Sequence, residues 1–192
     1  MPLPHESIVN RAIRQFAQKE IPSLLDWNHI KVLSQVQEGL IKYEAKGRGM
    51  TFEQLLSEAH DSGNLANYMT ANGDPRPHRL CHCHAIISGT HPRAAPLRAV
   101  MAWVKMRIDF PLNGVWLPCN TAAKIHMPRH LSKAVSHSRI HRNGYYIWLT
   151  TFVNQTLIKD DKTLAQALSK AKFHLETGTF PGYVMLRADQ LP

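Results

Sequence analysis

The sequence lacks the features that direct a protein into a membrane or into the secretory pathway. No apolar run approaches the roughly 18 to 20 residues that a membrane helix needs. The first residues, MPLPHESIVNRAIRQ, lack the apolar core of a signal peptide. We therefore expect a protein that is made in the cytoplasm and has no membrane segment, although export by a leaderless route would leave no trace in the sequence.

Cysteine is also scarce, since the chain has only three. An odd number of cysteines, two of them spaced C-x-C, argues against a disulfide framework. Cys81, Cys83 and Cys119 could form a structural zinc site with a histidine if the chain bulges there, because zinc favours tetrahedral sulfur and nitrogen ligands. The alternative is that these thiols are simply buried, as free cysteines commonly are.

Acidic side chains are nearly absent from one segment. Residues 74–145 hold eleven Lys and Arg against two acidic residues, so this segment accounts for the whole net charge of +9, and it also holds eight of the twelve histidines. A site that attracts a polyanion and acts on it requires such a combination of positive field and ligand-type side chains. A basic surface kept for solubility would not explain the histidines.

The hydrophobic periodicity predicts a mainly helical α+β fold. Helices are predicted over residues 5–20, 27–45, 51–59, 92–107, 124–135, 136–157 and 160–177, with Gly178 ending the last one. Residues 61–78 are rich in Gly, Asn, Asp and Pro, which favours a loop or linker with a boundary near residue 72. We therefore expect a helical region at 1–72 that packs on or flanks a core at 73–158, followed by a helix and tail at 159–192.

Histidines recur at ligand-like spacing. In HSRIH, His137 and His141 are four residues apart and would share one face of a helix, close enough to bind one metal ion. His126 and His130 have the same spacing, but Pro128 between them weakens the case for a regular helix. In the strand CHCHAII, alternation places His82 and His84 on one face and the two cysteines on the other, which makes His84 a possible third ligand.

The stretch NGVWLP at residues 113–118 completes a small motif. Asn-Gly favours a tight hairpin turn, and the apolar residues after it would pair back onto CHCHAII. A hairpin followed by a helix with two histidines is a ββα-metal arrangement. In such an arrangement a strand histidine activates water, an asparagine carbonyl orients that imidazole, and the helix holds the cation; Asn113 is the asparagine that precedes the second strand here.

The order of these motifs resembles a known family. CHAII, NGVWLP about twenty-five residues later, H-x-x-x-H and the pair Tyr145–Tyr146 resemble the AHH nucleases of the HNH/endonuclease VII group, the His-Me finger superfamily, over residues 80–150. The resemblance implies an endonuclease that hydrolyses nucleic-acid phosphodiester bonds, DNA more than RNA, with a divalent metal ion such as Mg, Mn, Zn or Ni. In this family the nuclease is often an antibacterial toxin that an immunity protein neutralises.

The resemblance also implies site residues. His84, Asn113, His137 and His141 are the expected catalytic positions, with His84, His137 and His141 as metal ligands. The family's strand motif is Ala-His-His followed by two aliphatic residues, and its second histidine acts as the base. Aligned on the aliphatics, this chain has alanine at the base position, Ala85. Three explanations stay open: a different register with His84 as the base, another group as the base, or an inactivating substitution.

Basic residues of the same segment are candidates for phosphate contacts, which position a strand without reading its sequence. They are Arg93, Arg98, Lys124, Arg129 and Arg142. Two other functions are also compatible with the sequence. One is a non-enzymatic nucleic-acid-binding domain stabilised by zinc, and the other is a restriction or repair nuclease of the host.

Overall fold

The structure is a computed structural model that describes residues 7–186 and residue 190. Its helices and strands are α1 (Ile8–Ala17), α2 (Leu24–Gly49), α3 (Phe52–Leu56), α4 (Ser62–Ala71), β1 (Cys81–Ala85), α5 (Ala95–Trp103), β2 (Gly114–Pro118), α6 (Asn143–Thr150) and α7 (Asp161–Thr177). Short 3-10 helices join them: η1 (Pro92–Ala94), η2 (Pro111–Asn113), η3 (Ala122–His126), η4 (Arg129–Leu131), η5 (His137–Arg139) and η6 (Gly182–Met185). The predicted mainly helical α+β fold is confirmed. Among the described residues, no helix combines the length and the apolar character that a membrane span needs.

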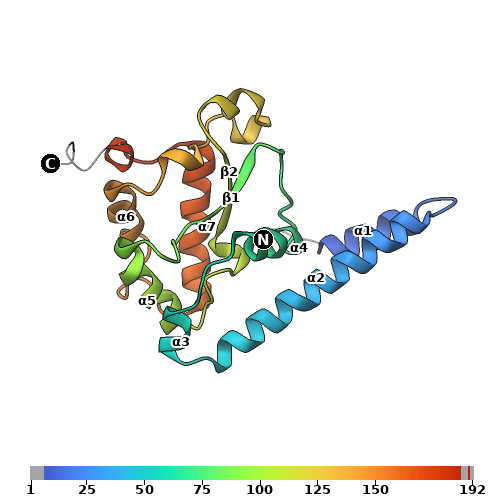
Figure 1. Cartoon of the computed structure of the whole chain (residues 1–192), viewed down its shortest axis with the longest axis horizontal. Helices are drawn as coiled ribbons and strands as arrows, with labels where there is room; N and C mark the ends of the chain where they lie inside the picture. Colours follow the sequence, from blue (N-terminus) through green and yellow to red (C-terminus); the bar gives the residue numbers. More distant parts are fainter. Residues whose placement is uncertain (1–6, 187–189, 191–192) are drawn as a thin grey trace.

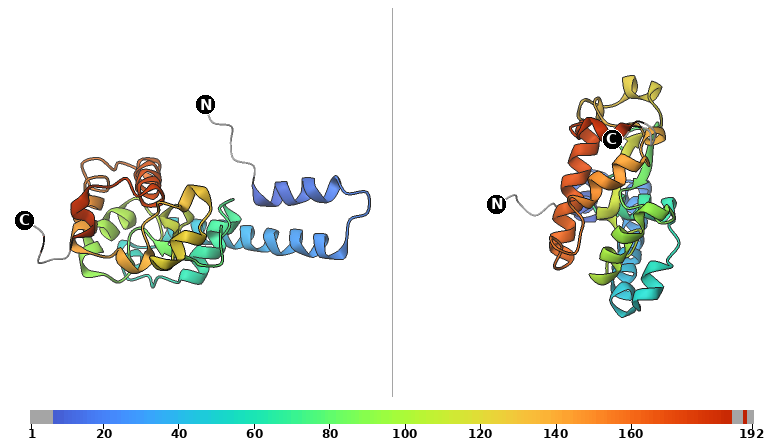
Figure 2. Two further views of the ribbon diagram at one scale, coloured as in Figure 1. Left: turned by 90° about the horizontal axis from the view of Figure 1, so that it is seen from above. Right: turned by 90° about the vertical axis from the view of Figure 1, so that its left-hand side faces the viewer.

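The first two helices form a hairpin that projects from the body of the molecule (Figures 1 and 2). The side chain of Ser23 caps α2 and forms a capping box with Asp26. Val9, Ala12 and Leu33 make a small apolar cluster between the two helices, separate from the main core. The helices predicted over 5–20 and 27–45 are therefore present, although α2 continues to Gly49 and residues 5 and 6 lie outside the described part of the chain.

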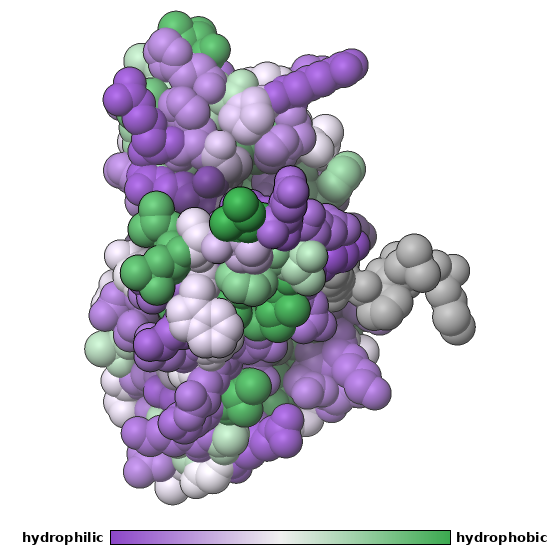
Figure 3. Space-filling model, turned by 90° about the vertical axis from the view of Figure 1, so that its right-hand side faces the viewer, coloured by the Kyte–Doolittle hydropathy of each residue, from purple (hydrophilic) through white to green (hydrophobic). Residues whose placement is uncertain are grey.

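The connection between these two helices exposes apolar side chains. Ile21, Leu24 and Leu25 are each more than 70% exposed. Figure 3 faces the molecule from the side of this hairpin and shows green apolar side chains interspersed with polar ones. The tip of the hairpin therefore presents these three apolar side chains to solvent.

The prediction of a loop over residues 61–78 is wrong, because α4 occupies most of that stretch. The Asp61 side chain accepts hydrogen bonds from the backbone N–H groups of Gly63 and Asn64 and so caps the helix. Leu65 and Met69, four residues apart, are buried in the main core. Burial of this pair outweighs the weak helix propensity of the Gly and Asn residues around it.

The two strands form an antiparallel sheet in which His84 pairs with Val115 and Ala85 with Gly114. The predicted pairing is confirmed, whereas the predicted tight turn at Asn113–Gly114 is wrong. Residues 86–113, including α5, separate the strands, and Asn113 ends the 3-10 helix η2 just before β2. Helix α4 packs against β1 and α7 against β2, so the sheet lies between helices (Figure 1).

The prediction of one long helix over residues 136–157 is also wrong. The chain makes the single turn η5 at His137–Arg139, then turns sharply, and α6 begins only at Asn143. His141 has a φ of +35°, a left-handed backbone that no α-helix accommodates. Likewise, the helix predicted over 124–135 is replaced by the two 3-10 turns η3 and η4, with Pro128 between them.

The last helix agrees with its prediction. Asp160 caps α7 through a hydrogen bond from the backbone N–H of Thr163, and Gly178 ends the helix with a φ of +67°. Leu164, Leu168, Ala171 and Leu175 are buried against the main core. The division of the chain near residues 72 and 158 stays a prediction, and the residues 1–6, 187–189 and 191–192 of its outer parts lie outside the described chain.

Candidate functional site

The centre of the site is a buried histidine with an unused ring nitrogen. His84 lies near the end of β1, and only 1% of its surface is exposed. Its Nε2 atom is buried and has no hydrogen-bond partner. A buried polar atom without a partner costs roughly 1 to 3 kcal/mol, so such atoms call for a ligand or another explanation.

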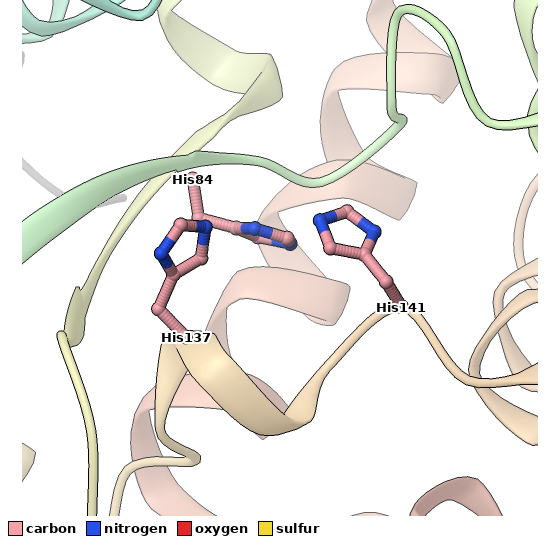
Figure 4. A group of neighbouring side chains, drawn as sticks. All are labelled: His84, His137 and His141. Atoms are coloured by element: carbon pink, nitrogen blue, oxygen red, sulfur yellow. The ribbon is translucent and has the colours of Figure 1, made fainter.

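Two further imidazoles, from the segment before α6, lie beside the ring of His84 (Figure 4). The ring centroid of His84 lies 5.1 Å from that of His137 and 4.8 Å from that of His141. One ligand atom from each of the three side chains lies within 4.8 Å of the others. The structure thus brings together the three predicted metal ligands, although His137 and His141 do not share a face of a helix as predicted.

The backbone at His141 is unusual, since its φ is +35°. A residue with a side chain rarely adopts a positive φ, and the strain costs of the order of 1 to 3 kcal/mol where it occurs. Among the described residues other than glycine, His141 shares this feature only with Lys105. The strained position coincides with the histidine cluster, which is where such strain is usually retained for function.

The three imidazoles are held in the neutral form that binds metal. Burial lowers the pKa of His84 well below its ordinary value, and the neighbouring histidines lower it further. Burial and His82 lower the pKa of His137. Desolvation of His141, followed by the effect of the nearby His137 and His91, lowers its pKa to about 4.

A second layer of side chains orients the cluster. The Nδ1 atom of His141 lies 2.8 Å from the hydroxyl oxygen of Tyr146. If Nδ1 carries the proton and donates it to this oxygen, Nε2 is free to coordinate a metal. His91 stacks on Tyr146 with ring centroids 4.4 Å apart, and Nδ1 of His82 lies 3.3 Å from Nδ1 of His137. His82 and His91 belong to this layer and were not predicted as site residues.

The donors present fit a divalent metal ion. Three neutral imidazoles within coordinating reach, one with a buried unpartnered nitrogen, are a common ligand set for zinc and for other first-row transition metals. Three protein ligands also leave coordination positions for water or substrate, as catalytic metal sites require.

The cysteine zinc site that the sequence left open is not formed, whereas the alternative of buried thiols describes Cys81. Among the described residues, the group of side chains able to hold a metal consists of histidines alone. Cys81 is buried and its sulfur contacts Met127, while the sulfur of Cys83 contacts Met69. Burial raises the pKa of the Cys83 thiol to about 12, which keeps it protonated. These two cysteines are therefore part of the apolar packing.

Asn113 is fully buried and extends the pairing of the two strands. Its side-chain Oδ1 accepts a hydrogen bond from the backbone N–H of Ile87, and its Nδ2 donates to the carbonyls of Ile87 and Ile108. Its own backbone carbonyl accepts from the N–H of Ile86. Asn113 thus fixes the chain directly after β1. Its catalytic role stays a prediction.

Position 85 carries no group that can accept a proton. Ala85 is 5% exposed, lies at the end of β1 and lines the same cleft as the histidine cluster. This cleft has a volume of about 820 Å³, and polar side chains including Arg76 and Asn67 form part of its wall.

The predicted phosphate contacts differ in their surroundings. The side chains of Arg93, Lys124 and Arg129 make no hydrogen bond or ion pair with another described residue. By contrast, Arg98 donates to the carbonyls of Ser88 and His91, and Arg142 donates to the carbonyl of Met185. The first three residues are thus available to a ligand, whereas the last two also support the chain. His126 and His130 are exposed and lie outside the cluster.

Sequence analysis did not identify one histidine that lines the cleft. His60 lies just before α4 and lines the cleft, and its Nδ1 is 2.5 Å from Oδ1 of the buried Asp109. A signal existed, because Asp109 is one of only two acidic residues in the basic segment 74–145. The partner could not be identified, however, since 48 residues separate the two positions.

Comparison with known proteins supports the same region of the chain. A family described as AHH, a nuclease family of the HNH/ENDO VII superfamily with conserved AHH, matches residues 65–176. The match covers more than half of the chain and includes His84, His137 and His141. No curated protein matches, and no solved structure matches either.

Proposed function

Since this chain belongs to the AHH nuclease family of the HNH/ENDO VII superfamily, we propose that it is a metal-dependent endonuclease that cleaves DNA. The observation that carries the proposal is the convergence of His84, His137 and His141, with one ligand atom of each within 4.8 Å of the others, in the lining of a cleft. Nucleases of this superfamily require a metal ion, and the cluster supplies the neutral nitrogen ligands for one.

The proposed core is a ββα-metal unit with altered helical geometry. Strands β1 and β2 form the pair, and the turn η5 with the strained residue His141 takes the place of the ligand-bearing helix. His84, His137 and His141 would hold the cation. When bound, a divalent cation stabilises negative charge on the phosphate and on the leaving oxygen.

The charge of the region supports a nucleic-acid substrate. Residues 74–145 carry the whole net charge of the chain. Arg93, Lys124 and Arg129 would bind phosphates, which gives affinity that falls with salt and does not depend on base sequence. We favour DNA over RNA on the resemblance alone, so the substrate is an outcome of the test below.

A second candidate function is favoured by one observation. On the register aligned on Ile86 and Ile87, Ala85 stands where the resemblance places the proton-accepting histidine, so the chain could bind nucleic acid through a structural metal without cleaving it. This candidate predicts full metal occupancy and no cleavage of plasmid DNA.

The biological role that we propose is that of an antibacterial toxin neutralised by an immunity protein. This role rests on the resemblance, as does export by a leaderless route. Expression in bacteria, with and without the product of a neighbouring small gene, tests it. If toxicity is not relieved by that product, a restriction or repair role in the host becomes the better explanation.

The function itself is tested with supercoiled plasmid DNA and a structured RNA of similar mass. Each is incubated with the purified chain and Mg²⁺, Mn²⁺, Zn²⁺ or Ni²⁺, and chelator-treated protein serves as control. We expect metal-dependent nicking of the plasmid and weaker degradation of the RNA. Metal binding without cleavage of either substrate, also when histidine is introduced at position 85, would support the non-enzymatic candidate.

A further inference from the structure

A histidine–carboxylate pair shares the cleft with the histidine cluster. Asp109 is 2% exposed, and its carboxylate accepts from His60 through Oδ1 and from the backbone N–H of Asp61 through Oδ2. The backbone N–H of Asp109 donates to the hydroxyl of Tyr43. No Lys or Arg forms an ion pair with Asp109 among the described residues, so His60 is the side chain that this buried carboxylate orients.

The pair leaves the second nitrogen of the His60 ring available. Asp109 engages Nδ1, and Nε2 is hydrogen-bonded to no residue that the structure describes. The His60 side chain is 24% exposed and lines the cleft together with His84, Ala85 and His141. A carboxylate on one ring nitrogen and an open second nitrogen is the arrangement of a histidine that accepts a proton from a substrate or from water.

His60 lies beside the chain that leaves β1. A Cβ atom built on Gly89, four residues after Ala85, would lie only 2.5 Å from Cβ of His60. His60 lies two residues before α4 and lines the same cleft as Ala85. It is also one of the charges that lower the pKa values of His84 and His141, as expected for a neighbour of the cluster.

We propose that His60, oriented by Asp109, is the general base of this chain and takes the role that Ala85 cannot fill. The proposal rests on the proposed nuclease function. It assigns to the reaction a residue outside the matched family region, which begins at residue 65. Asp109 is a positioning residue, since it acts through His60.

The step is a hydrolysis and needs no further reactant. A water molecule in the cleft loses a proton to Nε2 of His60 while its oxygen bonds to phosphorus. The P–O3′ bond breaks, and the leaving oxygen takes up a proton from solvent. His60 then releases its proton to solvent, which restores the starting state. General-base catalysis of this kind contributes about 10²- to 10⁴-fold to a rate.

A purely structural role for the pair must be distinguished, because His60 also ties the chain before α4 to Asp109. The variant His60→Asn makes this distinction. Asparagine carries an amide N–H at the position of Nδ1 and can still donate to Asp109, but it has no atom in place of Nε2. His126→Asn is the matched control, since His126 is exposed and lies outside the cluster.

The experiment compares plasmid cleavage by the parent, His60→Asn, His126→Asn, Ala85→His and the double variant His60→Asn/Ala85→His. Zinc affinity and thermal unfolding are measured for each. We expect His60→Asn to lose about 100-fold or more in rate with zinc affinity and unfolding temperature unchanged, and His126→Asn to match the parent. Restoring histidine at position 85 should make His60 dispensable, so the double variant should cleave like Ala85→His.

Chemical rescue provides a readout that a structural role would not move. Added imidazole should restore cleavage to His60→Ala, and the restored rate should rise with the basicity of substituted imidazoles. The proposal is overturned if His60→Asn cleaves within about threefold of the parent. It is also overturned if His60→Asn unfolds at a lower temperature than the parent and imidazole does not restore cleavage to His60→Ala. If the parent is inactive and Ala85→His cleaves, His60 is not the base and the nuclease assignment holds. If neither cleaves any substrate, the proposed function itself fails.

Discussion

The imidazoles of His84 and His141 face each other with their ring centroids 4.8 Å apart, although one belongs to strand β1 and the other to the turn before α6. The strand motif CHCHAII contains His84, and the separate motif HSRIH contains His141. The two residues therefore become neighbours only in the folded chain. The buried, unpartnered Nε2 of His84 and the strained backbone of His141 both become understandable if a cation lies between the rings.

Removing a ligand should weaken metal binding. We expect His84→Ala and His141→Ala to reduce zinc affinity by more than the roughly 10- to 100-fold typical of a lost supporting contact. His126→Ala should bind zinc like the parent, because His126 lies outside the cluster. Calorimetric titration of metal-free protein measures the three affinities. Equal affinities for His84→Ala and the parent would place the metal elsewhere.

The hydroxyl of Tyr146 should support the metal through His141. Tyr146→Phe removes the oxygen that lies 2.8 Å from Nδ1 of His141 and should lower zinc affinity by about 10- to 100-fold. Tyr145→Phe is the matched control. Its hydroxyl donates to the carbonyl of Ile86, so the control should lose stability, by roughly 1 to 3 kcal/mol, and keep its zinc affinity. The opposite pattern would show that Tyr146 does not orient a ligand.

The metal-free protein should lose stability in acid because of the cluster. Burial puts the folded-state pKa values of His84, His137 and His141 below the ordinary value of 6.5. The unfolded chain therefore binds more protons than the folded chain below about pH 6.5, and the free energy of unfolding falls. The loss attributable to His141 should continue down to about pH 4.

Urea unfolding of the metal-free protein between pH 7.5 and 4.5 measures this effect. His84→Gln cannot take up a proton, so its stability should depend less on pH over this range than that of the parent. His126→Gln should follow the parent. If the pH dependence of His84→Gln is as steep as that of the parent, His84 is not held neutral by the fold.

The cysteines should be dispensable for metal binding. The sulfur atoms of Cys81 and Cys83 contact methionines, and no cysteine joins the metal-ligating group among the described residues. The variant with alanine at positions 81, 83 and 119 should bind one zinc ion per chain with the affinity of the parent, at some cost in stability from the cavities left behind. If elemental analysis finds no zinc bound to this variant, at least one cysteine is a zinc ligand.

Much of the site was predictable because its residues are chemically distinctive. His84, His137 and His141 stand out by residue type and spacing, and the alternation along β1 correctly placed His82 and His84 on the face that approaches His137. Helix α7 also followed from periodicity, since its capping residue and its buried apolar positions agree. The pairing of β1 with β2 was predicted correctly, although the turn from which it was predicted is not formed.

The predictions that were wrong concerned features that depend on long-range contacts. The spacing of His137 and His141 is typical of a helix. In the turn before α6, however, His141 has a positive φ, which the local sequence does not predict. The Gly and Asn content of α4 favours a loop, and only packing of Leu65 and Met69 into the main core makes it a helix. The pair His60–Asp109 joins two segments with no shared motif, so only the folded chain shows it.

Cleavage of supercoiled plasmid by the parent, His141→Ala and His126→Ala, in the metal that best supports the parent, decides whether the histidine cluster is the catalytic metal site. We expect the parent and His126→Ala to nick the plasmid at similar rates and His141→Ala to be slower by about 100-fold or more, because it lacks a ligand of the metal that stabilises the transition state. Folding of each protein is checked by its thermal unfolding. Cleavage by folded His141→Ala at the rate of the parent would contradict the assignment of the histidine cluster as the catalytic metal site.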